Sequence, residues 1–363
     1  MLCVFDLMRI EISYEQKLIN MFKTISYLFL LVTIITYNVS GQHTGIKNNS
    51  NVKFNPGHYV AVGPYFKLAE IKYLNEPVLC GVNKRYFWRT LEPEKDKYDF
   101  STIQEDLDYC AKHDKQLIVF LCDRAFWIKG AVPPYLREHE WKNEGGGFSP
   151  IRWNPEFLTR FLAIGEAISK RFDTHPNFEG IAIQETALDM PEEILMKYDY
   201  TPKKYQDALL SILKEFATSF SNSNVFWYQN GIQGSNNLIR QIADSISHRG
   251  NIIMGGPDIL PYRKWLRHTY KIYGDYQDRI KLFSSAQDDS YKHHKNDVRQ
   301  GLKTPIPEEG YLTMEGIFLY ARDSMYVQYL FWNYYYEGIE KGEKSFDDAI
   351  DVIRKHPTFN IPK

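Results

Sequence analysis

The sequence predicts a (β/α)8 barrel, a single α/β domain with a long loop after its third strand. Short apolar or β-branched runs alternate with longer stretches of helical spacing, and eight such runs occur in about 300 residues. No low-complexity linker or solenoid repeat interrupts this pattern, which favours one domain. A doubly wound open sheet is the alternative, but that fold usually has fewer strands, and no glycine-rich phosphate loop follows the first run.

The predicted strands are residues 58–63, 81–88, 116–122, 178–185, 224–230, 251–256, 281–287 and 326–332. Helices are predicted between them. One spans 101–114, with Ser101 as its cap and acidic side chains in its first turns, and another spans 155–172, with apolar side chains on one face. Parallel strands joined by crossover helices all end at the same side of the barrel, here called the mouth, where such barrels have their functional residues.

The amino-terminal region predicts export. Residues 21–41 combine a positive charge, an uncharged apolar run and small residues at cleavage-site spacing, which is typical of a signal peptide. Residues 1–20 are then an upstream extension, 42–56 a flexible polar leader and 57–363 the barrel. We expect a secreted or periplasmic protein without a membrane span after signal cleavage. The alternative is an uncleaved anchor, for which the apolar run is somewhat short.

Composition favours a neutral partner. The formal charge is −1, from 44 basic and 45 acidic residues, so no strong field attracts nucleic acid or an anionic membrane. Aromatic residues are 15% of the chain, with 26 Tyr and 7 Trp, and such amphipathic rings suit a sugar-binding cleft. Cys80, Cys110 and Cys122 match no zinc spacing, and nothing in the sequence implies a metal or cofactor.

Polar and aromatic residues follow most of the predicted strands. They are Arg85, Trp88, Asp123, Arg124, Trp127, Gln184, Glu185, Tyr228, Asn230, Asp258, Gln287, Asp288 and Trp332. Amides and carboxylates can bind sugar hydroxyls while rings cover the apolar sugar face, so the set predicts a carbohydrate ligand. The long loop at 132–153 is expected to form a lid or a wall of this site.

One segment carries a family resemblance. Residues 86–121, beginning "YFWRTLEPEKDKYDF", resemble the Trp-x-x-Leu-Glu-Pro…Tyr-Asp-Phe segment of clan A glycoside hydrolases, which include many β-galactosidases and β-glycosidases. The resemblance implies that Glu185 is the general acid/base and that Trp332 stacks on sugar. The chain departs from the clan in two places. Gln184 replaces the usual Asn, and the strand-seven Glu is missing, with Gln287 and Asp288 in that region.

Glycoside hydrolysis requires two carboxyl groups, whose separation determines the stereochemical outcome. Glu185 follows an apolar strand and is predicted to be the general acid. Asp258 and Asp288 are the two candidates for its partner. Asp258 follows two glycines that permit a sharp turn, while Asp288 is nearer to the position that the resemblance implies. The predicted activity is that of an O-glycosyl hydrolase acting on an oligo- or polysaccharide.

Other interpretations remain open from the sequence. The missing strand-seven Glu allows a non-catalytic carbohydrate-binding barrel, and Tyr228 allows a polysaccharide lyase with a tyrosine base. Glu185 could instead be a structural partner of Arg85 or Arg124. Asp258 could cap the following helix, and Asp288 could be a solvated loop charge. The sequence favours no particular oligomeric state.

Overall fold

The computed structural model describes residues 52–125, 130–143, 145–188, 190–235, 237–260, 266–287, 290–291, 313–334 and 345–360. The predicted upstream extension, the export signal and residues 42–51 of the predicted leader lie outside these residues, as do Trp127 and Asp288. Within the described ranges, no helix has both the length and the apolar character needed to cross a membrane.

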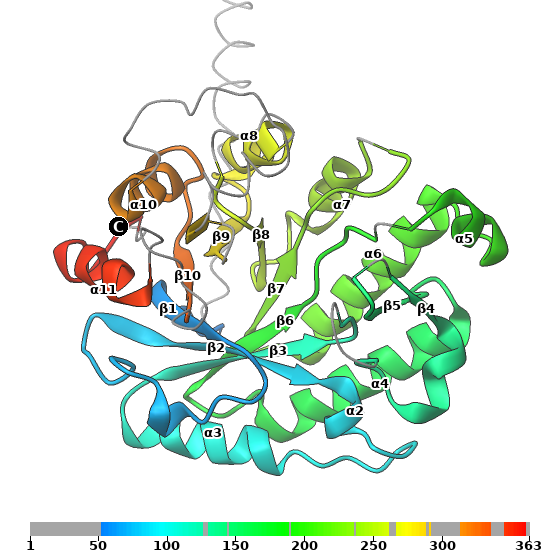
Figure 1. Cartoon of the computed structure of the whole chain (residues 1–363), viewed down its shortest axis with the longest axis horizontal. Coiled ribbons are helices and arrows are strands. Elements are labelled where there is room, and N and C mark those ends of the chain that lie inside the picture. Colours follow the sequence, from blue (N-terminus) through cyan, green and yellow to red (C-terminus); the bar gives the residue numbers. More distant parts are fainter. Residues whose placement is uncertain are drawn as a thin grey trace, which may run out of the picture. The chain divides into compact units, whose positions relative to one another are not determined.

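Eight parallel strands close into a barrel, which confirms the predicted fold class (Figure 1). They are β1 (Gly57–Val62), β2 (Leu79–Phe87), β3 (Gln116–Cys122), β6 (Phe178–Ile183), β7 (Asn224–Tyr228), β8 (Ile252–Pro257), β9 (Lys281–Ala286) and β10 (Tyr329–Asn333). Each barrel strand pairs with the barrel strands that precede and follow it in the chain, and β10 pairs with β1. Every predicted strand overlaps one of these, with ends that differ by up to three residues.

Helices surround the strands, as the alternating pattern predicts (Figure 1). The longer ones are α3 (Ser101–Lys112), α4 (Pro155–Phe172), α6 (Pro202–Ser219), α7 (Leu238–Ile246), α8 (Leu266–Tyr276), α10 (Met314–Asp323) and α11 (Phe346–Lys355). The short ones are the 3-10 turns η1 (Leu68–Glu70) and η2 (Pro134–His139) and the helices α2 (Trp88–Leu91) and α5 (Glu192–Lys197).

Local chemistry explains where α4 begins. The Asn154 side chain accepts hydrogen bonds from the backbone N–H groups of Glu156 and Phe157, and Pro155 occupies the first turn, where its missing N–H costs nothing. Ser101 is not the cap of α3 that the sequence suggested. It is the first helical residue, and its N–H donates to the Asp99 carboxylate at 3.0 Å.

Apolar side chains form two layers, one inside the barrel and one between the strands and the helices. On β10, Tyr329 and Phe331 belong to the inner layer, whereas Leu330 and Trp332 belong to the outer one. This alternation is the two-residue period of a strand. It decides which predicted site residues face the barrel interior and which pack against helices.

A buried acid lies at the amino-terminal end of the barrel, opposite the mouth. Glu179 accepts hydrogen bonds from Asn55 N at 3.0 Å and Asn55 Nδ2 at 2.7 Å, and the Tyr329 hydroxyl also donates to it. Burial raises the pKa of Glu179. Lys53 Nζ donates to the Asp173 carbonyl at 2.6 Å. Residues 53–56 therefore belong to the folded barrel, so the predicted flexible leader does not extend to residue 56.

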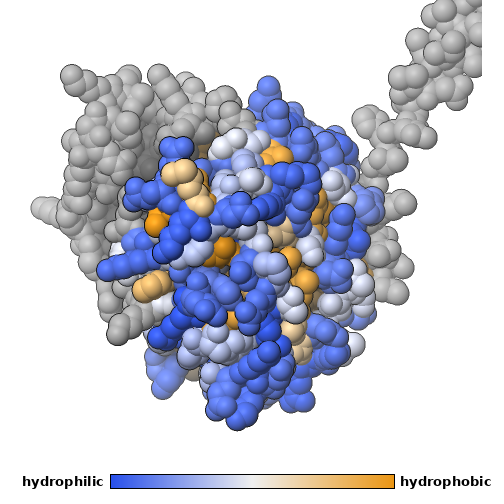
Figure 2. All heavy atoms as spheres, turned by 90° about the vertical axis from the view of Figure 1, so that its right-hand side faces the viewer, coloured by the Kyte–Doolittle hydropathy of each residue, from blue (hydrophilic) through white to orange (hydrophobic). Residues whose placement is uncertain are grey.

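The long loop after β3 is an ordered substructure. It contains η2 and a short antiparallel pair, β4 (Glu140–Lys142) and β5 (Phe148–Pro150). Trp141 is buried, and Ala125, just beyond β3, pairs with Phe148. The side of the molecule that includes α4, α5 and α6 is largely hydrophilic, with scattered apolar side chains (Figure 2). Among the described residues, the loop is therefore held by its own antiparallel pair and by the pairing of Phe148 with Ala125.

Candidate active site

Glu185 lies at the mouth, two residues beyond the last residue of β6. Its Oε2 accepts a hydrogen bond of 2.7 Å from Asn230 Nδ2, and its Oε1 lies 3.6 Å from Arg124 Nη1. The Glu185 side chain is 18% exposed and that of Arg124 is 3% exposed. The carboxylate is therefore held from two sides and still reaches solvent.

The three residues come from the ends of adjacent strands. Arg124 follows β3, Glu185 follows β6 and Asn230 follows β7, and these strands pair side by side in the barrel. Backbone contacts fix the strand ends. Arg124 N donates to the Gln184 side-chain oxygen, and Asn230 N donates to Thr186 Oγ1 at 2.9 Å. Neighbouring strand tips are thus tied into one rigid unit, as a preorganised site requires.

The buried Arg152 links the ends of β3 and β6 through contacts with Asp123 and Glu185. Its guanidinium makes two bonds to the Asp123 carboxylate, of 2.7 and 2.8 Å, and donates to the backbone carbonyl of Glu185 at 2.8 Å and to the Tyr205 hydroxyl at 2.9 Å. The side chains of Arg152 and Asp123 are 3% and 1% exposed. Asp123, expected to bind substrate, instead orients the arginine that positions Glu185.

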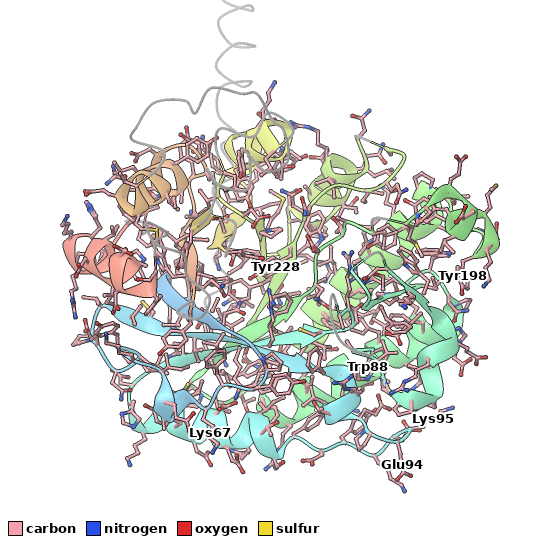
Figure 3. The ribbon with its side chains drawn as sticks, in the orientation of Figure 1. Lys67, Trp88, Glu94, Lys95, Tyr198 and Tyr228 are labelled. Carbon is pink, nitrogen blue, oxygen red and sulfur yellow. The ribbon has the colours of Figure 1, made fainter. Side chains whose placement is uncertain are left out.

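Two predicted sugar-binding tryptophans lie outside the mouth, contrary to expectation. Trp332 is fully buried in the outer layer, and its Nε1 donates to His58 Nδ1 at 2.9 Å. Trp88 is also fully buried, packs edge-on against Phe157 and donates to the Glu92 carboxylate at 2.7 Å. Figure 3 shows Trp88 at α2, away from Tyr228, which ends β7 near the centre of the view. Neither indole can stack on a sugar in this structure.

Arg85 and Tyr228 do face the interior of the mouth. The Phe120 ring stacks on Tyr228 with centroids 4.8 Å apart, and the Arg85 guanidinium lies 5.4 Å from the same Phe120 centroid. Tyr228 is 2% exposed, and burial raises the pKa of its hydroxyl. A phenol that holds its proton so firmly is a poor general base, which counts against the lyase interpretation.

The candidates for the second carboxylate are at the ends of β8 and β9. Asp258 follows β8 with a backbone φ of 62° and is partly exposed. Its carbonyl accepts from the Tyr270 hydroxyl at 3.1 Å. Beyond β9 the half-buried Gln287 is the last described residue before Asp288, which lies outside the described ranges. At these two strand ends, the described residues therefore offer one carboxylate, that of Asp258.

Sequence reasoning missed two residues near the site. Arg152 ends the long loop and carries no local pattern, because its role depends on Asp123, which is 29 residues away. Glu140 in β4 is 6% exposed, one of its oxygens has no hydrogen-bond partner among the described residues, and burial raises its pKa to about 7. A buried carboxyl with a shifted pKa often marks a functional region.

One group among the described residues could hold a metal ion. Glu138, His139 and Glu156 each place a ligand atom within 4.8 Å of the others. Both acidic side chains are exposed, at 75% and 55%, and pair with the histidine. Exposed clusters of this kind commonly form ion pairs without a metal, so these three residues do not by themselves indicate a metal site.

No protein-family model matches the chain, and no curated protein matches it in sequence. Solved structures match it in fold. An endoglycoceramidase II from Rhodococcus sp. has a TM-score of 0.51 and 10% identity, covering 85% of this chain and 80% of that one. A structure described as a glycoside hydrolase has a TM-score of 0.51 and 12% identity, covering 83% and 99%.

A β-galactosidase from the psychrophilic Marinomonas ef1 has a TM-score of 0.49 and 11% identity over 82% of this chain, which spans 58% of that protein. The match to an exo-β-1,4-mannosidase from Opitutaceae bacterium strain TAV5 covers 54% of that protein. The chain thus spans little more than half of these two proteins. At such identities, the structures that match with TM-scores of 0.51 show that this chain has the (β/α)8 fold found in glycoside hydrolases.

Proposed function

We propose that this chain hydrolyses a glycosidic bond in an oligo- or polysaccharide, with Glu185 as general acid. The observation that carries the proposal is the placement of a partly exposed carboxylate at the mouth, held by Asn230 and backed by the buried Arg152. Barrels of this fold have their chemistry at this end. The glycoside hydrolases that share the fold support the same class of reaction.

The proposed mechanism uses two carboxyl groups. Glu185 in its protonated form gives its proton to the glycosidic oxygen as the bond to the anomeric carbon breaks, and a second carboxylate either attacks that carbon or removes a proton from the attacking water. Asp258, at the end of β8, and Asp288, beyond β9, are the candidates for the second role. An aspartate is one methylene shorter than a glutamate, which favours the wider, inverting geometry.

Sugar binding in this proposal involves groups that face the mouth. Arg85, Gln184, Asn230 and Gln287 carry side chains that can form hydrogen bonds with hydroxyl groups. Arg85 lies near the end of β2, and the other three lie just beyond the ends of β6, β7 and β9. We also propose that the chain is exported through residues 21–41, because a polysaccharide substrate is met most often outside the cell. No cofactor is needed for this chemistry.

The test is a glycan screen with a matched pair of variants. Purified wild type, Glu185→Gln and Glu166→Gln are assayed against a panel of plant, bacterial and animal glycans by detection of new reducing ends. Glu166 is an α4 side chain, 56% exposed and paired with Lys170, so its variant controls for loss of one surface carboxylate. We expect turnover by wild type and Glu166→Gln and a loss of at least about a hundredfold in Glu185→Gln.

Equal turnover by all three proteins would reject Glu185 as the acid. Turnover lost equally in Glu185→Gln and Glu166→Gln would point to misfolding, which circular dichroism would reveal.

A second candidate is a barrel that binds carbohydrate without cleaving it. Two observations favour it: Arg124 lies 3.6 Å from the Glu185 carboxylate, and β9 is followed by Gln287 where the resembling clan has a glutamate. A carboxylate held beside a guanidinium can accept hydrogen bonds from sugar hydroxyls without taking part in bond cleavage. Saturable glycan binding by wild type, with no new reducing ends on any glycan of the panel, would establish this alternative.

A further inference from the structure

Two adjacent aromatic side chains are exposed on the loop that follows β1. Tyr65 is 76% exposed and Phe66 is 40% exposed. Single exposed apolar residues need no explanation, but neighbouring exposed rings beside a candidate site often serve recognition. They directly follow Gly63 and Pro64, so they stand at the mouth end of the barrel.

The exposed rings are continuous with the lining of the mouth. The Tyr65 ring lies 6.2 Å from the ring of Phe87, which ends β2 and belongs to the inner apolar layer. On the other side, Phe66 packs edge-on against Tyr334, just beyond β10, with centroids 5.5 Å apart. Tyr334 N in turn donates to the carbonyl of Ala61 in β1 at 2.9 Å. Contacts on both sides hold the loop, so its aromatic faces are preorganised.

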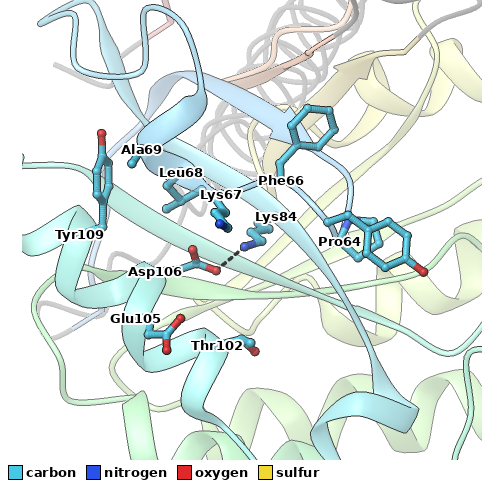
Figure 4. Close-up of a pocket in the computed structure, with 11 residues that line it drawn as sticks. Pro64, Phe66, Lys67, Leu68, Ala69, Lys84, Thr102, Glu105, Asp106 and Tyr109 are labelled. Atoms are coloured by element: carbon cyan, nitrogen blue, oxygen red, sulfur yellow. Dashed lines mark hydrogen bonds and ion pairs between the residues drawn. The ribbon is translucent and has the colours of Figure 1, made fainter.

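Beside these rings the surface is hollowed. The hollow has a volume of about 370 Å³ and lies between the loop at 64–69 and α3. Figure 4 shows Thr102, Glu105 and Asp106 rising from α3 toward this loop. Lys84 Nζ donates to Asp106 Oδ2 at 2.6 Å on its floor. The hollow thus combines an aromatic wall with a polar floor, at a volume typical of small-ligand sites.

The charges in the hollow favour a neutral ligand. Lys67 and Lys84 are balanced by Glu105 and Asp106, and Lys84 and Asp106 neutralise each other in a buried pair. An anionic or cationic ligand would therefore meet as much repulsion as attraction. A sugar ring matches the site better, because its C–H face covers an aromatic ring while its hydroxyls bond to Glu105 and Thr102.

We propose that Tyr65 and this hollow form an accessory subsite that binds one sugar unit of the same glycan whose cleaved bond lies at Glu185. The inference rests on the proposed function and adds to it a preference for extended glycans. A long chain leaving the mouth crosses the Tyr65 ring and places a further unit in the hollow. A short glycoside that fills only the mouth does not reach it.

The test compares Tyr65→Ala, Tyr65→Phe and Tyr326→Ala. Tyr326 is 36% exposed and precedes β10 at the opposite end of the barrel, so its variant is a matched control. The probes are cello-, manno-, xylo- and galactohexaose, each with the 4-nitrophenyl glycoside of its sugar. Binding is measured calorimetrically in the Glu185→Gln background, and turnover is measured in the wild-type background.

We expect Tyr65→Ala to raise Kd and KM for the recognised hexasaccharide about three- to tenfold, with kcat and the nitrophenyl glycoside kinetics unchanged. Tyr65→Phe keeps the ring and Tyr326→Ala lies at the other end, so both should behave like wild type. A hexasaccharide that is bound and cleaved equally well by Tyr65→Ala overturns this inference and leaves the proposed function intact. If wild type neither binds nor cleaves any probe, both fail.

Light scattering on the same variants tests the other occupant of this face, a second copy of the chain. A dimer that becomes a monomer in Tyr65→Ala, with glycan affinity unchanged, would make the face a subunit interface and overturn the subsite.

Discussion

Asn230 Nδ2 lies 2.7 Å from Glu185 Oε2, so the ends of two adjacent barrel strands, β7 and β6, meet at one carboxylate. The backbone of Asn230 is fixed separately, by its N–H bond of 2.9 Å to Thr186 Oγ1. The side-chain amide can therefore be changed without releasing the strand end. Its contribution to orienting Glu185 can be measured by itself.

Asn230→Ala should lower kcat/KM for the glycan that wild type cleaves by about ten- to a hundredfold, the value of one hydrogen bond to a charged group. The reason is that Glu185 loses the donor that fixes its carboxylate plane. Steady-state kinetics measure the effect, and circular dichroism checks that the barrel is intact. Unchanged kinetics in Asn230→Ala would mean that this contact does not position the acid.

Trp332→Phe should destabilise the fold and leave glycan binding unchanged. The variant loses the 2.9 Å bond to His58 Nδ1 and leaves space in a fully buried layer, at a cost of about 1–3 kcal/mol. Burial lowers the pKa of His58 to about 4, so the ring is neutral at pH 7 and its Nδ1 can accept a hydrogen bond from the indole N–H. Urea denaturation and calorimetry with glycan provide the two readouts. Weaker glycan binding at unchanged stability would contradict this prediction and indicate that Trp332 contributes to sugar binding.

The contrast between strands and site side chains explains what the sequence could predict. The strands were found because burial on both faces produces continuous apolar runs, a signal contained within each segment. The direction of a single side chain depends on register, and a shift of one residue reverses it. On β10, Phe331 faces the interior and Trp332 faces the helices, a distinction that the apolar run does not contain.

Contacts between side chains that are far apart in the chain could not be predicted from the sequence either. Asp123 was expected at the mouth because it follows β3, and it does follow it, but its carboxylate is occupied by Arg152 from the end of the long loop. Glu185 was predicted from its place after a buried strand, and its partners Arg124 and Asn230 follow neighbouring strands. Barrel geometry alone places Glu185 beside the ends of the neighbouring strands, whereas a distant loop determines the contact of Asp123.

Asp123→Asn should cost about 3–5 kcal/mol of stability, because it leaves the Arg152 guanidinium buried without its counter-charge. The matched control is Asp207→Asn, which breaks an exposed pair with Lys203 whose side chains are 57% and 70% exposed. That change should cost less than about 1 kcal/mol. Urea denaturation of both variants gives the comparison, and similar losses in the two would contradict a structural role for the buried pair.

Glu140→Gln should change how stability depends on pH. Burial raises the pKa of Glu140 from an ordinary value near 4.5 to about 7, so the native state binds its proton more tightly than the unfolded chain does. The stability that this proton confers is fully present below about pH 4.5 and is lost as the pH rises through 7. Glutamine keeps the shape of the protonated acid and does not titrate. The unfolding free energy of the variant minus that of wild type should therefore increase by about 3 kcal/mol between pH 4.5 and pH 8. Urea denaturation of both proteins at half-unit pH intervals measures this difference, and a difference that stays constant across the range would show that Glu140 does not titrate there.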